Sequence, residues 1–227
     1  MNYKVRLLTY TAITVVVVGG MSGCFPDDDK TKSVSYGISD PVQTLVIEGS
    51  TGDIRVTGGG SGVQVVEHQT YRSKPPAAVH STAGGTLTLS YKCPDGNCGV
   101  GYEVEVPAGT VVRVSDDTGA VRLTGLSGQI EARSDTGSIE ATRLSAASVD
   151  LRTSTGGVTA SFETQPETVK ATTDTGSVRV KVPAGDPYTV AARADTGSVN
   201  VAVSQQPGAR RTITASTSTG NVTVANA

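Results

Sequence analysis

Residues 130–141 read Ile-Glu-Ala-Arg-Ser-Asp-Thr-Gly-Ser-Ile-Glu-Ala. Apolar and polar residues alternate on both sides of the central Thr136-Gly137 pair. This alternation indicates two short strands, each with one buried face. The Thr-Gly pair predicts the tight turn between them, because glycine tolerates the positive φ that such a turn requires. The stretch therefore predicts a unit of strand, turn and strand.

The unit recurs along the chain. Thr-Gly pairs stand at Thr51-Gly52, Thr118-Gly119, Thr136-Gly137, Thr155-Gly156, Thr175-Gly176, Thr196-Gly197 and Thr219-Gly220. From Gly119 onward, successive glycines of these pairs are 18, 19, 20, 21 and 23 residues apart. A period of about twenty residues is typical of proteins built from stacked coils.

The copies also share an apolar pattern. Aligned on the glycine, the positions seven and five residues before it and two and four residues after it are apolar in every copy, as Ile130, Ala132, Ile139 and Ala141 are around Gly137. One unit cannot bury this face alone, whereas stacked units can. We expect an all-β, single-domain β-solenoid over residues 40–227, similar to a parallel β-helix, with coils stacked in sequence order. A meander of antiparallel hairpins is the alternative.

The first residues have the pattern of an export signal. Lys4 and Arg6 precede an apolar stretch, Leu7–Val18, that is too short to span a bilayer. The small residues directly before Cys24 resemble a bacterial lipobox, which implies cleavage after residue 23 and a lipid (diacylglycerol with palmitate) on Cys24. We expect a signal peptide at 1–23 and a flexible tether at 24–39, because the latter is charged and lacks an apolar period.

The repeat resembles that of the bacterial DUF4097 family, whose members carry the label "putative adhesin". The resemblance depends on the Asp-Thr-Gly-Ser-Val/Ile unit at Asp135–Ile139, Asp174–Val178 and Asp195–Val199, and on the Val-Pro-Ala-Gly corners at Val106–Gly109 and Val182–Gly185. It spans roughly Thr44 to Val224. It implies a β-solenoid with an adhesin-like role and assigns no catalytic residues.

The turn residues are the candidate site. They are the glycines and the aspartates two positions before them: Asp117, Gly119, Asp135, Gly137, Gly156, Asp174, Gly176, Asp195, Gly197 and Gly220. We expect the aspartates to cap their turns by accepting hydrogen bonds from nearby backbone N–H groups. Two alternatives are an aspartic protease pair, which the periodic recurrence disfavours, and a column of carboxylates that binds Ca²⁺.

Cys93 and Cys98 flank a Pro-Asp-Gly turn. In an exported protein, such a pair is expected to form a disulfide. A metal site or a redox pair is the alternative, although the spacing is longer than that of redox motifs and only His68 and His80 could add imidazole ligands. Cys24 is then left unpaired, as a lipid acceptor should be.

Composition narrows the function. The formal net charge of −2 gives no reason to expect nucleic acid as a partner, and the lack of Trp leaves few platforms for stacking sugars. We expect an extracytoplasmic, lipid-anchored protein that is not an enzyme, has no cofactor or metal, and binds an envelope protein or polysaccharide. A polysaccharide-cleaving β-helix and a module that signals envelope stress are alternatives. We also expect self-association at the C-terminal coil, where the chain stops with an open edge.

Overall fold

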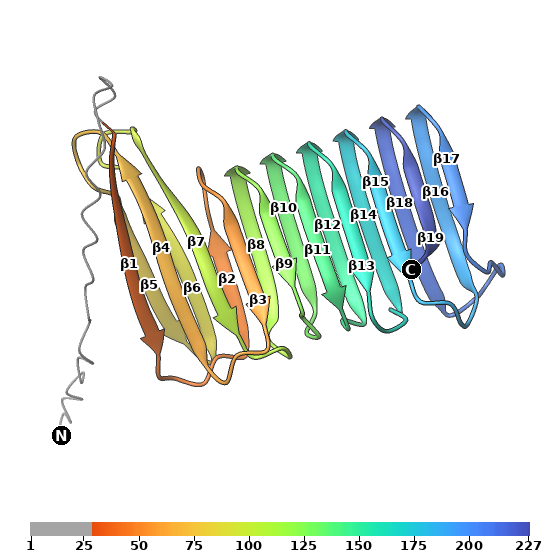
Figure 1. Cartoon of the computed structure of the whole chain (residues 1–227), viewed down its shortest axis with the longest axis horizontal. Helices are drawn as coiled ribbons and strands as arrows, with labels where there is room; N and C mark the ends of the chain where they lie inside the picture. The colour runs from red at the N-terminus through yellow and green to blue at the C-terminus, as the bar shows by residue number, and fades with distance from the viewer. Residues whose placement is uncertain (1–28) are drawn as a thin grey trace, which may run out of the picture.

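The structure is a computed structural model that describes residues 29–227, and every element in this range is a β-strand (Figure 1). The strands are β1 (Lys30–Ile38), β2 (Thr44–Glu48), β3 (Ile54–Gly58), β4 (Val63–Tyr71), β5 (Ala77–Ala83), β6 (Thr86–Lys92), β7 (Cys98–Val106), β8 (Val111–Thr118), β9 (Val121–Thr124), β10 (Ile130–Thr136), β11 (Ile139–Leu144), β12 (Ser148–Thr155), β13 (Val158–Phe162), β14 (Thr168–Thr175), β15 (Val178–Val182), β16 (Tyr188–Thr196), β17 (Val199–Ala202), β18 (Arg211–Thr219) and β19 (Val222–Asn226). The described part contains no helix that could cross a membrane.

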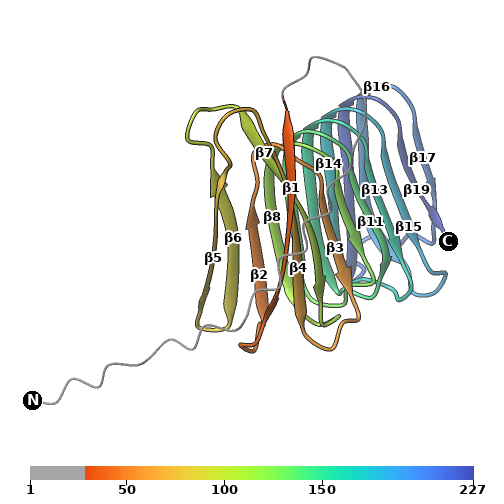
Figure 2. The ribbon, with the colours of Figure 1, turned by 60° about the vertical axis from the view of Figure 1, so that its left-hand side comes forward.

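The strands form two facing sheets. Sheet A has the order β1-β4-β7-β3-β9-β11-β13-β15-β19-β17, and sheet B has the order β16-β18-β14-β12-β10-β8-β2-β6-β5. A strand of sheet B, the turn after it and the next strand of sheet A make one coil, here called a rung and named by its residues. The turn is a Thr-Gly turn in every rung except 86–106, where the Cys93–Cys98 loop joins the strands. Figure 2 shows the rungs stacked behind one another. The buried apolar side chains form one core cluster between the sheets. The predicted β-solenoid is confirmed.

The rungs pair in parallel and in register. Ile130 lies beside Val112 and Val149, and Ile139 lies beside Val121 and Val158. Because every second residue of each strand points inward, this register places apolar residue against apolar residue along the whole stack. The positions predicted to point inward are buried in every rung except 188–202. The hairpin meander is therefore wrong for this region.

The predicted order of stacking is wrong at the C-terminal end. Rung 211–226 lies between rungs 168–182 and 188–202, since β18 pairs with both β14 and β16, and β19 pairs with both β15 and β17. The expected open C-terminal coil is thus internal, and rung 188–202 forms the end of the stack. All these rungs share one apolar pattern and one register, so the core residues would be buried in the observed stacking order and in the sequence order alike.

The N-terminal end departs from the repeat as well. Rung 86–106 stacks in parallel on rung 44–58, which in turn stacks on rung 111–124. Strands β1, β4 and β5 then add antiparallel pairs: β1 with β4, β4 with β7, and β5 with β6. Neither β5 nor these antiparallel pairings was predicted.

The flexible tether predicted at residues 24–39 is wrong over most of its length. Residues 30–38 form β1, a nine-residue strand that pairs with β4 along its full length. The strand is polar because it lies at the edge of the sheet, with its first four residues exposed. The predicted signal peptide, Cys24 and the start of the predicted tether lie outside the described residues.

Candidate functional site

The Thr-Gly turns form a continuous column along one edge of the solenoid. The backbone N–H of Gly137 donates to the carbonyl oxygen of Thr155 at 2.8 Å, and that of Gly156 donates to Thr175 at 2.9 Å. Gly156 has a φ of 142°, and a Cβ at this position would collide with the carbonyl group of Gly137. The other predicted turn glycines repeat both features: Gly119, Gly137, Gly176, Gly197 and Gly220. Glycine is therefore required for rungs to approach this closely.

Capping of the turns comes from a residue that was not predicted. The hydroxyls of Thr153, Thr173 and Thr217 donate to the carbonyl oxygens of Gly137, Gly156 and Gly176 at 2.8, 2.8 and 2.9 Å. These threonines are buried and stand three positions before their own turn glycine. Each hydroxyl thus joins one rung to the next. Their recurrence at a fixed offset was visible in the sequence.

The predicted aspartates instead face solvent. Asp117, Asp135, Asp174 and Asp195 are exposed, and their predicted role of accepting backbone hydrogen bonds is not observed. The carboxylate of Asp117 accepts from Ser50 Oγ at 2.9 Å, and that of Asp195 accepts from Arg193 Nε at 2.7 Å. The extended strand end directs these side chains outward, because the residue before each of them is the one that points inward.

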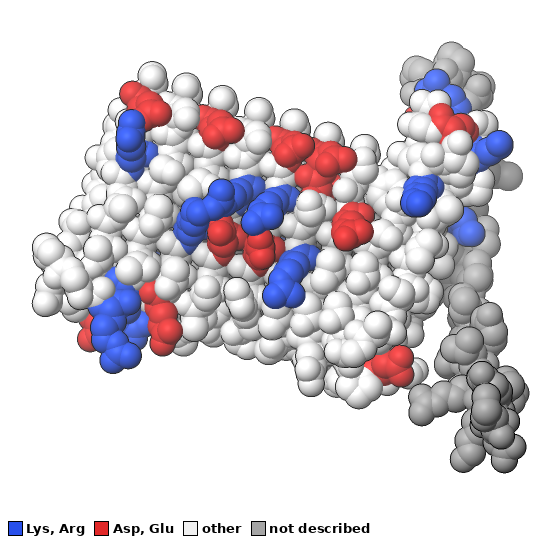
Figure 3. All heavy atoms as spheres, turned by 180° about the vertical axis from the view of Figure 1, so that it is seen from behind, with Lys and Arg blue, Asp and Glu red and all other residues white. Residues whose placement is uncertain are grey.

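The exposed aspartates are spaced along the edge rather than gathered into one site. In the order of the stack, the turn positions are Asp117, Asp135, Ser154, Asp174, Ser218 and Asp195. Figure 3 shows acidic groups following this long edge of the molecule. Among residues 29–227, no group of three or more His, Cys, Asp or Glu side chains is arranged to hold a metal ion.

Asp116 is the exception in the buried capping column. It aligns with Ser134, the capping position of the next rung, and is only 3% exposed. Its carboxylate oxygens are buried and accept no side-chain hydrogen bond within residues 29–227. Burial, together with the nearby charges of Asp117 and Asp53, raises the pKa of Asp116 to about 6. Asp53 accepts hydrogen bonds from Ala120 N and Arg122 Nη1, which lower its own pKa. Asp116 thus places a titratable group where other rungs have a hydroxyl.

A stripe of opposite charges crosses the outer face of sheet B. Arg113, Glu131, Asp150 and Lys170 occupy neighbouring strands in one register. Arg133 Nη2 lies 2.6 Å from Glu131 Oε1, and Arg152 lies 3.3 Å from Asp150. Figure 3 shows acidic and basic groups interspersed in the middle of this face. These exposed pairs contribute little to stability, so the stripe is foremost a polar surface.

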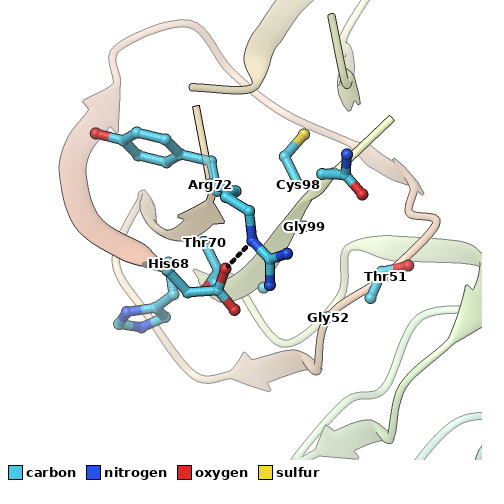
Figure 4. Close-up of a pocket in the computed structure, with 11 residues that line it drawn as sticks. Thr51, Gly52, His68, Thr70, Arg72, Cys98 and Gly99 are labelled. Atoms are coloured by element: carbon cyan, nitrogen blue, oxygen red, sulfur yellow. Dashed lines mark hydrogen bonds and ion pairs between the residues drawn. The ribbon is translucent and has the colours of Figure 1, made fainter. Parts of the chain in front are cut away.

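A hollow lies where the turn column meets the N-terminal strands (Figure 4). Its volume is about 410 Å³, and its walls include Thr51, Gly52, His68 and Arg72. The Arg72 side chain reaches Asp29, with Nε 3.2 Å from Oδ1. This hollow was not predicted, because β4 and β7 carry no repeat motif. Its few polar groups can bind a small polar ligand, but they do not form an acid–base pair.

Cys93 and Cys98 form the predicted disulfide, with their Cα atoms 5.5 Å apart. The bond closes the loop between β6 and β7, beside the hollow, which Cys98 also lines. The metal and redox alternatives for this pair thus receive no support from the geometry. The third cysteine, Cys24, lies outside the described residues.

Comparisons with known proteins agree on the fold. The chain is similar to a structure described as a "putative adhesin" from Bacteroides fragilis, at 13% identity and a TM-score of 0.53, with 87% of this chain and 97% of that chain covered. It is also similar to a "putative cell adhesion protein" from Clostridium sporogenes, at 13% identity and a TM-score of 0.50, with 87% and 100% covered. No curated protein matches the sequence.

The sequence itself matches one protein family. The matched region, residues 103–226, begins in β7 and ends with the last strand, so it includes the regular part of the solenoid and its turn column. The family is described as Toastrack DUF4097. The chain belongs to the Toastrack DUF4097 family.

Proposed function

We propose that this protein is a lipoprotein of the bacterial cell envelope whose non-catalytic solenoid presents an adhesin-like binding surface. The observation that carries the proposal is the Cys93–Cys98 disulfide in a chain whose remaining cysteine, Cys24, follows an export-type leader. Disulfides persist in oxidising compartments outside the cytoplasm. The adhesin descriptions of the similar structures support a surface location.

The length of the solenoid suits a protein that presents its surfaces away from a membrane. Strand β1 begins six residues after Cys24, so a lipid on Cys24 would lie within about 20 Å of that end of sheet A. Sheet A has ten strands, which places β17 about 43 Å further along the stack at the usual strand spacing. The solenoid then holds the turn column and the charged stripe along a rigid arm that extends from the anchor.

The turn column is the surface we assign to the partner, an envelope protein or polysaccharide. An exposed Asp or Ser stands at this turn position in every rung from 111–124 to 188–202. No ion pair is formed by Asp135 or Asp174 among the described residues, whereas Glu131 and Asp150 on sheet B are already paired with arginines. Such a row of exposed carboxylates and hydroxyls can accept hydrogen bonds from a repetitive partner. Nothing within residues 29–227 favours the polysaccharide-cleaving or the signalling alternative.

The anchor is tested with Cys24→Ala in the full chain expressed in its host. We expect loss of palmitate labelling and release from the membrane fraction, because the thiol is the proposed acceptor. A Cys93→Ser/Cys98→Ser variant is the control, since it removes thiols elsewhere and should stay labelled. Unchanged labelling and membrane retention of Cys24→Ala would refute the lipoprotein assignment.

The surface is tested with Asp135→Ser/Asp174→Ser. Serine already occupies the same turn position at Ser154 and Ser218, so the variant should fold normally. We expect it to lose most of the partner that the wild-type chain captures by crosslinking in intact cells. A Glu131→Ser/Asp150→Ser variant on sheet B should keep the partner. The reverse pattern would move the binding surface to sheet B and overturn the assignment.

A further inference from the structure

The end of the solenoid formed by rung 188–202 is uncovered within the described part of the chain. Strands β16 and β17 are each the last strand of their sheet. Val190, Ala192 and Val201 are only partly buried and Val199 is 45% exposed, although the equivalent residues of other rungs are buried. The apolar core therefore opens at this end, together with two strand edges. Such an edge readily pairs with another strand.

Strand β16 has backbone N–H and C=O groups that no other strand of the described chain pairs with, and they are centred on Ala192. Tyr188 N donates to Ser204 O at 2.9 Å and Tyr188 O accepts from Gln206 N at 3.0 Å, on the side away from β18. Successive residues of a strand direct their N–H and C=O groups to opposite sides. Val190, Ala192 and Ala194 therefore direct theirs to the same open side as Tyr188. Ala192 is the midpoint of these three.

Strand β17 has a matching set. Val222 N donates to Ser198 O at 2.9 Å, which directs the backbone groups of Asn200 toward β19 and those of Val199 and Val201 toward the open side. Ala192 precedes Gly197 by five residues and Val201 follows it by four, so the two lie at about the same height across the core. A single two-fold axis at this height would therefore pass through both Ala192 and Val201.

The other end of the solenoid is closed between its sheets, although β5 there is the last strand of sheet B. Its edge strand β1 carries Lys30 and Lys32, and charged residues on an edge oppose further pairing. Between the sheets, the ring of Tyr36 stacks on that of His80 with centroids 4.5 Å apart, and Tyr36 Oη donates to Glu67 at 2.6 Å. This end is therefore closed by side chains, and Figure 1 shows it at the opposite end of the stack.

We propose that two copies of this protein associate end to end through rung 188–202. The two β16 strands pair antiparallel about Ala192 and the two β17 strands pair about Val201. Val190 of one copy then forms hydrogen bonds with Ala194 of the second copy. Arg193 lies opposite Ala191 of the second copy and Asp195 lies opposite Thr189, so like charges do not meet. The pairing uses both open edges and closes at two copies.

The mass of the full chain in solution tests the association. Sedimentation equilibrium in density-matched detergent should give twice the chain mass for the wild type. Ala192→Lys should give a monomer, because an inward-pointing charge at the axis cannot be buried. Val79→Lys, at an exposed position on β5, is the matched control and should remain dimeric. Retention of a cooperative thermal transition in both variants excludes misfolding. A monomeric wild type, or a dimeric Ala192→Lys, would overturn the proposal.

Oxidative crosslinking tests the register. A residue on the axis lies opposite the same residue of the second copy, with the two Cα atoms about 5.5 Å apart. A disulfide can span this distance. Ala192→Cys should therefore give a disulfide-linked dimer in high yield. Ala191→Cys, which lies opposite residue 193 of the second copy, should give little. A dimer that crosslinks as well through Ala191→Cys, or that fails to crosslink through Ala192→Cys, would contradict this geometry.

Discussion

Thr153 donates its hydroxyl to the carbonyl oxygen of Gly137 at 2.8 Å, across the boundary between two rungs. The bond is buried and recurs between further rungs, so it joins the stack along the turn edge. Its contribution can be measured, because valine has nearly the shape of threonine without the donor.

Thr153→Val should lower the free energy of unfolding by about 1–3 kcal/mol, since it leaves a buried carbonyl oxygen without its donor. Urea denaturation followed by circular dichroism measures the change. Thr172→Val is the control, because Thr172 points outward and its hydroxyl has no hydrogen bond among those of the described residues. Equal destabilisation by both substitutions would show that the inter-rung bond contributes nothing specific.

Gly156→Ala should destabilise by about 3 kcal/mol or more, through backbone strain at φ 142° and the collision with Gly137. Gly157→Ala, one residue away, should be close to neutral. A Cβ at Gly157 would find its nearest neighbour, the carbonyl oxygen of Ser177, at 3.5 Å, and its φ is not in the left-handed region. Comparison of the two midpoints of urea unfolding tests the column directly, and similar midpoints would argue against it.

Asp116 should make stability depend on pH. Its pKa is raised from 3.8 to about 6 in the folded chain, so the folded state binds the proton more tightly than the unfolded state. The stability that this proton confers is complete below about pH 4 and is lost as pH rises to about 6, with a change on the order of 1–2 kcal/mol. Asp116→Asn should remove this slope, and Asp116→Thr should also raise stability at pH 7. Thermal melts from pH 4 to 7 measure both effects. A wild-type slope retained in Asp116→Asn would assign it to another group.

Tyr36→Phe should destabilise the N-terminal end by about 1–3 kcal/mol, because Glu67 is 4% exposed and loses the hydroxyl donor at 2.6 Å. Hydrogen exchange should show faster opening of β1 and β4. Tyr71→Phe, a half-buried tyrosine at the end of β4 whose hydroxyl has no hydrogen bond among those described, is the control. No change in Tyr36→Phe would mean that residues 30–38 do not depend on this contact.

The repeating part of the fold could be predicted from the sequence. The repeat of about twenty residues determines both which side chains point into the core and how neighbouring strands align. Ile130 and Ile139 are buried for the reason that their spacing from Gly137 predicts. The order of the final rungs was not accessible, since Val190 and Ile213 occupy the same repeat position and fit the same neighbour. The strand at 30–38 was missed for a different reason: its first four residues are polar and exposed, and its short alternation of Val34, Tyr36 and Ile38 is only partly buried.

The location of the candidate site at the Thr-Gly turns was predicted, but the residues that cap the turns were not. The glycines do what their repeat implies, because a Cβ has no room in the column. The aspartates do not cap, since the polar residue that reaches the neighbouring carbonyl is the inward-facing one before them. Asp116 and Ser134 occupy that inward position, and their polar character within an apolar pattern was the available signal. The hollow beside Arg72 depends on which strands meet, which the residues alone do not encode.

The position of rung 211–226 has a consequence for how the protein is made. As the chain emerges from N- to C-terminus, β16 and β17 are complete before β18 and β19 exist, and at that stage β14 and β15 present free edges in the matching register. A provisional stack in chain order is therefore available to the nascent protein. Wherever that provisional stack forms, the native arrangement is reached only when β18 and β19 replace β16 and β17 against β14 and β15, which is an exchange of strands and not a simple addition.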